Sequence, residues 1–185
     1  MENFLRKIKL IDSFSTTLNA TKSEFTSALR GHVDESDIDG MFSGAFEAFT
    51  SSENKFKGLV NHNGFKIRKR RRFFERNFGK AVATGNLREQ GDTLVINTQI
   101  NAFNNHLLFM FGALIVFYIV FFISAFGSIF SESSGLPTFV PIFVIIHAVF
   151  MFGIPYFIMR RGVRHMKQDL EREFYFVINK SSSLR

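Results

Sequence analysis

Leu107–Phe130 (LLFMFGALIVFYIVFFISAFGSIF) and Thr138–Met159 (TFVPIFVIIHAVFMFGIPYFIM) are two apolar runs without a charged side chain, separated by the polar residues 131–137 (SESSGLP). As a helix, the first run reaches about 36 Å, and a bilayer core measures about 30 Å. The short connection leaves room only for two antiparallel, neighbouring helices. The two runs therefore predict a transmembrane hairpin with spans at about 107–130 and 138–159.

The hairpin divides the chain into three expected parts. Residues 1–104 are long enough for one small cytoplasmic α+β domain, residues 105–160 form the transmembrane hairpin, and residues 161–185 form a cytoplasmic amphipathic helix and tail. The chain has no cysteine, which excludes disulfides and zinc sites built on cysteine. Because residues 1–10 lack the apolar core of a signal peptide, we expect the first span to act as the insertion signal.

The charge distribution predicts the orientation of the hairpin. The net charge is +7, and the connection between the spans carries only the acidic Glu132. Four cations follow the second span closely: Arg160, Arg161, Arg164 and Lys167. Since Lys and Arg are retained on the cytoplasmic side, both termini are expected in the cytoplasm, where anionic lipid headgroups attract positive charge.

Local signals predict two helices in the N-terminal region. A first strand is plausible within residues 7–19. Thr21 and Glu24 have the spacing of a capping box, so a helix is expected from there to about Val33. Ser36 or Asp37 then caps a second amphipathic helix that ends near Phe49.

Alternating apolar and polar residues predict two hairpins after these helices. Asn63-Gly64 indicates a type I′ turn between strands over about 56–60 and 65–72. The second hairpin runs over about 80–88 and 93–101, with its turn near Gly91. The expected fold class is thus an α+β membrane protein: a small antiparallel-sheet cytoplasmic domain with two helices, then the transmembrane hairpin, then a C-terminal amphipathic helix.

The apolar positions after the second span predict that helix. Their spacing of three, four or seven continues the second span as a helix with one apolar stripe. The stripe consists of Val163, Met166, Leu170, Phe174 and Val177. A strand over 174–178 is the alternative.

A dense basic cluster is the strongest surface signal. On the strand from Phe65, Lys66 and Arg68 should alternate with apolar residues, which produces an almost unbroken positive strip on one face. The cluster consists of Lys66, Arg68, Lys69, Arg70, Arg71, Arg72, Arg76 and Lys80. We expect it to contact anionic lipid, and an acidic partner protein or a merely solvated sheet face are the alternatives. Nucleic acid is the less favoured ligand because no RNA-binding motif accompanies the cations.

His147 lies near the middle of the second span. Intramembrane ionisable residues often mark ion paths, but neither span offers a charged relay. We therefore expect a neutral His147 that bonds to Tyr118, to a backbone carbonyl or to another subunit. Other expected packing positions are small residues that allow close helix approach: Ser124, Gly127, Ser128 and Gly153.

Motifs for catalysis or metal binding do not emerge from the sequence. Residues 35–46 match the first places of a calcium loop, yet the twelfth place is Phe46 and not a carboxylate that could close the site. No nucleophile motif, HExxH or phosphate-binding glycine loop occurs. We expect a non-enzymatic protein without a cofactor.

The segments FKGLV (56–60), GFKIRKR (64–70) and GDTLVI (91–96), with the two spans behind them, resemble uncharacterised bacterial two-span membrane proteins with an N-terminal α/β cytoplasmic region. The resemblance implies the bacterial inner membrane and no particular activity. The leading hypothesis is an accessory or scaffold subunit whose hairpin packs with other membrane subunits or with itself. The alternative is a membrane-anchored module for an apolar ligand, because the element order resembles helix-grip domains, although too few strands are evident for a complete one.

Overall fold

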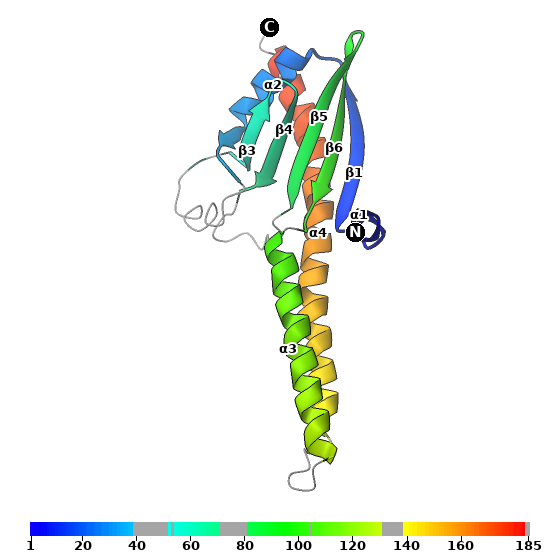
Figure 1. Cartoon of the computed structure of the whole chain (residues 1–185). Helices are drawn as coiled ribbons and strands as arrows, with labels where there is room; N and C mark the ends of the chain where they lie inside the picture. The colour runs from blue at the N-terminus through cyan, green and yellow to red at the C-terminus, as the bar shows by residue number, and fades with distance from the viewer. Residues whose placement is uncertain (39–51, 53, 71–80, 104, 131–138, 184–185) are drawn as a thin grey trace. The chain divides into compact units, whose positions relative to one another are not determined.

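The computed structural model describes residues 1–38, 52, 54–70, 81–103, 105–130 and 139–183 (Figure 1). Contacts divide the chain into two units, Met1–Ala102 with Met159–Arg185, and Phe103–Ile158. The second part of helix α4 therefore belongs with the N-terminal domain. The elements in chain order are α1 (Glu2–Lys7), β1 (Ile11–Leu18), α2 (Lys22–Gly31), β2 (Val33–Glu35), β3 (Phe56–Asn61), β4 (Gly64–Lys69), β5 (Val82–Gln90), β6 (Thr93–Asn101), α3 (Asn105–Phe130) and α4 (Phe139–Ser183).

A six-stranded sheet is the centre of the first unit, with strand order β1-β6-β5-β4-β3-β2. Neighbouring strands are antiparallel except β2, which runs parallel to β3. The α+β layout is thus confirmed, but the sheet is mixed and not purely antiparallel. The difference arises because α2 ends at Gly31 and Val33 already belongs to a strand, where a helix to Val33 was expected. A three-residue strand is too short for its alternation to be recognised in the sequence.

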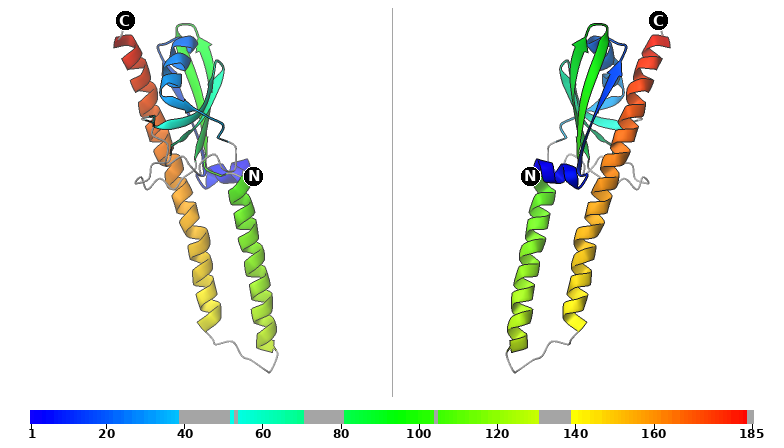
Figure 2. Two further views of the ribbon diagram at one scale, coloured as in Figure 1. Left: turned by 90° about the vertical axis from the view of Figure 1, so that its left-hand side faces the viewer. Right: turned by 90° about the vertical axis from the view of Figure 1, so that its right-hand side faces the viewer.

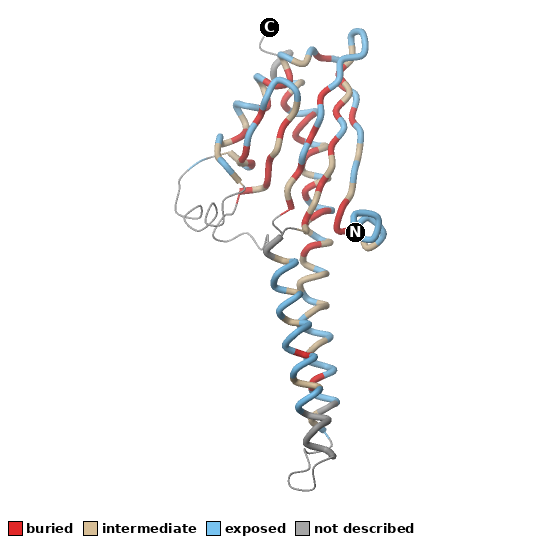
Figure 3. The backbone as a smooth tube through the Cα atoms, in the orientation of Figure 1, coloured by how far each residue is buried: buried red, intermediate tan, exposed pale blue. Residues whose placement is uncertain are grey.

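Each long strand buries one face, as the alternation of its residues predicts (Figure 3). The helix-covered face carries apolar side chains such as Ile67, Ala83 and Ile96, all fully buried. On the opposite face lie uncharged polar side chains of β1, β5 and β6. We call this the polar face and define it by Ser13, Ser15, Thr84, Asn86, Asn97 and Gln99.

Helices α2 and α4 pack on the same face of the sheet (Figure 2). The capping box of Thr21 and Glu24 is present, as predicted, and starts α2. The predicted apolar stripe of α4, from Val163 to Val177, is buried against the sheet, so this segment is a helix and not the alternative strand. The expected second helix from Ser36 or Asp37 to Phe49 falls largely on residues 39–51, outside the described residues.

The two predicted hairpins form, but the first has a different turn. Asn61 pairs with Gly64, so the turn residues are His62 and Asn63 and not Asn63-Gly64. Neither has the positive φ that a type I′ turn requires, since Lys9 is the one non-glycine residue with positive φ in the described chain. A Cβ on Gly64 would lie 2.2 Å from the carbonyl oxygen of Gly85. Close approach to β5, and not turn geometry, explains this glycine.

A short helix, α1, precedes the first strand, where the sequence indicated strand from residue 7. The helix ends in a Schellman motif: the Leu10 amide donates to the Leu5 carbonyl at 2.9 Å and the Lys9 amide to the Arg6 carbonyl at 3.0 Å. Lys9 adopts φ 60° at the position that usually holds glycine. Leu5 and Leu10 are both buried, which supplies the apolar contact of the motif.

Two long helices form the second unit: α3 and the first part of α4. Both are long and apolar enough to cross a membrane. They contact each other through ring pairs such as Phe111 and Phe152, whose centroids are 5.7 Å apart. Many apolar side chains of the two helices are exposed, including Phe109 and Ile123, so packing within the chain does not bury them.

Candidate functional site

The basic strand β4 separates its residues between the two faces of the sheet. Phe65 and Ile67 are buried on the helix-covered face, as predicted. Lys69 lies on this face too, and its Nζ pairs with Oδ2 of Asp169 on α4 at 3.0 Å. Arg68 has its side chain on the opposite face and is only 6% exposed. The alternation predicts a row of solvated cations on one face of β4, and the described part of the strand does not form one, because Arg68 is buried and Lys69 lies on the helix-covered face.

Asp34 explains the position of Arg70. Nη1 of Arg70 donates to Oδ2 of Asp34 at 2.8 Å, and Arg70 is only 5% exposed. The other carboxylate oxygen accepts from the Ser52 hydroxyl at 2.9 Å and from the Asn54 amide at 2.8 Å. Burial raises the pKa of Asp34, but these two hydrogen bonds together with the positive charges of Arg70 and Lys57 outweigh burial and lower the pKa below its ordinary value. Arg70 thus has a structural role.

The cations of α4 differ in their surroundings. Lys167 pairs with Asp12 of β1 at 3.2 Å and lies 5.7 Å from the centre of the Phe14 ring. Arg161 donates to Nε2 of His165 at 3.2 Å and is exposed, as is Arg164, while Arg160 is half-buried. Three arginines therefore lie in the two turns that follow Met159, where the apolar sequence of α4 ends.

The ion pairs also determine how α4 lies on the sheet. Lys167 reaches β1 at one end of the strand order, and Asp169 reaches β4 on the other side of the apolar stripe. The buried carboxylate of Glu173 pairs with Nδ1 of His32 at 3.1 Å and with Nζ of Lys55 at 3.4 Å. Opposite charges on the two sides of the stripe favour a single rotation of the helix over the sheet.

Phe174 fills the space between α4 and the sheet. Its ring centroid is 5.4 Å from that of Phe25, 5.5 Å from that of Phe65 and 6.3 Å from that of Phe14. Leu170 is likewise fully buried. A helix-grip module holds its apolar ligand in this space, and here the protein's own rings occupy it.

Tyr118 and His147 form the polar contact inside the second unit. The Tyr118 hydroxyl is 2.7 Å from Nδ1 of His147, and the tautomer of the imidazole decides which group donates. Tyr118 is buried between α3 and α4, and its ring also contacts Phe152 at 5.9 Å. Of the three partners considered for His147, the structure thus selects Tyr118.

The predicted small-residue packing positions are only partly described. Ser124 is exposed on α3. Among the described residues, a Cβ on Gly153 would meet nothing within 4 Å, so Gly153 is not a point of close approach between the described parts of α3 and α4. Gly127 and Ser128 belong to α3, but their side chains lie outside the described residues, as do Arg71, Arg72, Arg76 and Lys80 of the basic cluster.

The polar face contains a shallow, open cleft of about 400 Å³. Hydroxyl and amide side chains of β1, β5 and β6 line it: Ser13, Ser15, Thr84, Asn86, Asn97 and Gln99, together with Phe14 and Thr98. The sequence signal was present in the alternation of Asn97 and Gln99 with buried residues. Over the described ranges, no group of three His, Asp or Glu side chains is placed to hold a metal ion.

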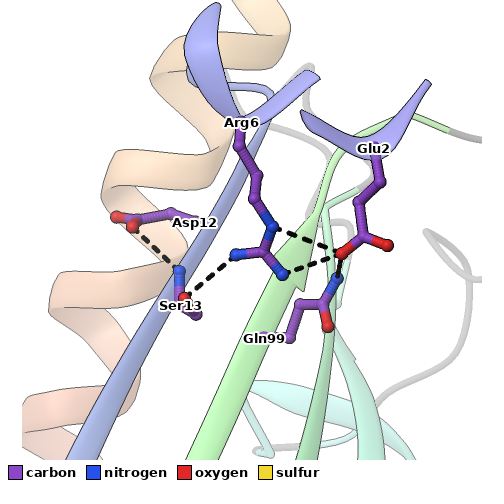
Figure 4. A network of polar contacts seen from close by, with 5 residues as sticks. All are labelled: Glu2, Arg6, Asp12, Ser13 and Gln99. Atoms are coloured by element: carbon purple, nitrogen blue, oxygen red, sulfur yellow. Dashed lines mark hydrogen bonds and ion pairs between the residues drawn. The ribbon is translucent and has the colours of Figure 1, made fainter. Parts of the chain in front are cut away.

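Helix α1 was not expected from the sequence, although Glu2 and Arg6 have the i, i+4 spacing of a helical ion pair. Arg6 donates to Glu2 at 2.8 Å and to the Ser13 hydroxyl at 3.1 Å, and Gln99 donates to the same Glu2 oxygen at 3.2 Å (Figure 4). The Arg6 guanidinium, first through its hydrogen bond and then through its charge, lowers the pKa of Glu2. These contacts attach α1 to the polar face.

In comparisons with protein-family models, with curated proteins and with solved structures, the chain finds no match.

Proposed function

We propose that this chain is a non-enzymatic integral membrane accessory or scaffold subunit of a membrane complex. On this proposal it lies in the bacterial inner membrane with both termini in the cytoplasm, and cations of its cytoplasmic domain contact anionic lipid or a partner protein. No reaction is part of the proposal, because the polar groups described above form ion pairs, helix caps and a neutral cleft.

The transition within α4 is the observation that carries the proposal. Up to Met159 the helix has large apolar side chains exposed, including Phe143 and Phe157. After Met159 the same continuous helix buries only one stripe against the sheet and adds Arg160, Arg161 and Arg164. Exposed apolar surface of this extent is typical of contact with lipid or with another subunit, and cations at its end favour the cytoplasmic side.

Lipid contact is assigned to fewer residues than the sequence indicated. Lys69, Arg70 and Lys167 neutralise carboxylates of the same domain. Arg161 and Arg164 remain as exposed cations beside the apolar part of α4. Cations near an anionic membrane surface gain about 1 kcal/mol each, so these two should contribute measurable selectivity for anionic lipid.

A charge-reversal experiment tests this assignment. The full chain is purified in mild detergent, and mass spectrometry identifies the lipids and proteins that accompany it. Arg161→Glu with Arg164→Glu should lose bound anionic lipid or the accompanying protein. The matched control is Arg88→Glu, an exposed arginine of β5 near the turn to β6, which should retain both. A lone monomer with one stoichiometric apolar ligand would contradict the proposal and support the ligand-binding alternative.

A further inference from the structure

We propose that α1 is a second membrane contact of this chain, in which Phe4 enters the interfacial region of the bilayer while Lys7 and Lys9 face anionic headgroups. The inference rests on the proposed membrane location. It adds a site that the apolar runs do not contain.

The two sides of α1 are chemically different. Leu5 is buried against the domain, whereas the neighbouring Phe4 is 62% exposed. Lys7 and Lys9 are exposed as well. A large apolar side chain beside lysines is the pattern of a helix that lies in the plane of a membrane interface.

The position of α1 is held firmly, so the exposure of Phe4 does not come from a loose end. The Schellman motif at Lys9 joins the helix to β1. Side-chain hydrogen bonds also attach α1 to the sheet, from Arg6 to Ser13 and from Gln99 to Glu2 (Figure 4). Because Lys9 takes a conformation that costs a non-glycine residue energy, the structure around it must favour this placement.

The chain connection limits the distance between the end of α1 and the first residue of α3. Ile11 pairs with Asn101, and the amide of Ala102 donates to the carbonyl of Leu10 at 3.0 Å. Helix α3 begins at Asn105, and the three residues from Ala102 to that point span at most about 11 Å. If α3 enters a bilayer near its first residue, the end of α1 cannot be far from the membrane surface.

Lipid is the occupant that the charges favour. The exposed Lys7 at the end of α1 and Lys9 just after it match an anionic leaflet, and Arg161 and Arg164 repeat this match at the start of the domain part of α4. A second copy of the chain would bring the same lysines against each other, which is unfavourable.

The absence of tryptophan from the chain provides a direct test. Phe4→Trp introduces one reporter at the proposed contact. Tyr175→Trp is the matched control, because Tyr175 is an exposed aromatic residue of α4 about 24 Å along the helix from Met159. Each full-length variant is reconstituted into vesicles of phosphatidylcholine with phosphatidylglycerol, with and without brominated acyl chains, and flotation after an alkaline wash measures insertion.

We expect both variants to float, with blue-shifted emission and bromine quenching for Phe4→Trp only. Floating Phe4→Trp protein whose emission is unquenched, solvent-exposed and equal to that of the control would overturn the α1 contact and leave the proposed function standing. Blue-shifted but unquenched emission that depends on protein concentration would assign Phe4 to a second copy and would also overturn it. Failure of both variants to float would overturn the membrane location together with the α1 contact.

Discussion

Asp34 connects two separate segments of the domain through one carboxylate. It accepts from Ser52 and Asn54 with one oxygen and from Arg70 with the other. Its neighbour across the β2–β3 pair is Lys57. A single residue of the three-residue edge strand β2 thus neutralises a buried arginine and holds the segment of Ser52 and Asn54.

Replacement of Asp34 should therefore change stability and its pH dependence. The folded-state pKa of Asp34 lies below its ordinary value of 3.8, so its stabilising contribution is complete above that value and is lost as pH falls through the folded pKa. Asp34→Asn should lower the free energy of unfolding at neutral pH by about 1–3 kcal/mol, because Arg70 loses an acceptor. The variant should also lose less stability than the parent protein between about pH 5 and about pH 2.

Urea unfolding in mild detergent at neutral pH and at both ends of that range measures these quantities. Asp92→Asn serves as the control, since Asp92 is exposed in the turn between β5 and β6. This change should alter neither the free energy of unfolding nor its pH dependence. Equal stability of Asp34→Asn and the parent at neutral pH would exclude a structural role for the carboxylate.

The Tyr118 hydroxyl should stabilise the helix pair through His147. Tyr118→Phe removes one hydrogen bond and retains the ring, so we expect a loss of about 0.6 kcal/mol and at most about 1.7 kcal/mol, the average and the maximum for interhelical hydrogen bonds in a membrane. Unfolding by sodium dodecyl sulfate in lipid bicelles measures the change. Tyr175→Phe removes an exposed hydroxyl elsewhere on α4 and should have no effect, and a matching loss in both variants would contradict the assignment.

At the scale of elements, the packing of α4 on the sheet depends on one glycine. A Cβ on Gly85 would lie 2.2 Å from Cε1 and Cζ of Phe65, whose ring packs against Phe174. Strand β5 therefore leaves room for an aromatic ring of β4, and that ring supports the buried side chain of α4. Packing of this kind transmits a small change in a strand to a helix.

Gly85→Ala should destabilise the domain by about 1–3 kcal/mol through overpacking. Combination with Phe65→Leu should recover part of the loss, because the smaller side chain can move away from the new methyl group. Gly31→Ala is the control: a Cβ added there in α2 would meet nothing within 4 Å, and the change should be neutral or stabilising by less than about 1 kcal/mol. Thermal unfolding followed by circular dichroism compares the two single variants, the double variant and the control with the parent protein. Additive losses in the double variant would count against direct contact between position 85 and the Phe65 ring.

Elements in which the apolar pattern repeats several times were predictable from the sequence, and elements in which it does not repeat were not. The capping box starts α2, and the stripe from Val163 to Val177 is buried, because both signals are local and the stripe repeats over several turns. Helix α1 and strand β2 escaped recognition because neither repeats its own period twice: the six residues of α1 make fewer than two helical turns, and β2 has only three residues. The alternation of β4 correctly separated Phe65 from Lys66, but it could not tell that Arg68 is buried, because that depends on contacts outside the strand.

At the scale of the whole molecule, orientation in a membrane is the property to establish. The chain lacks cysteine, so single cysteines can be introduced as unique labels. On the proposed topology, with both termini in the cytoplasm, Ser134→Cys in the connection between the apolar runs should react with a membrane-impermeant maleimide in bacteria whose outer membrane has been opened. Asp92→Cys should react only after the inner membrane is lysed. The reverse pattern would invert the proposed topology.

The sequence alone determined the two apolar helices, the charge at their ends and the periodic elements of the domain, because hydrophobic length and residue period act locally along the chain. Only the tertiary structure decided the parallel pairing of β2, the burial of Arg68 and Arg70, the choice of Tyr118 for His147 and the attachment of α1 to the polar face. Each of these depends on which partner is available across a distance in sequence, and periodicity carries no information about such partners.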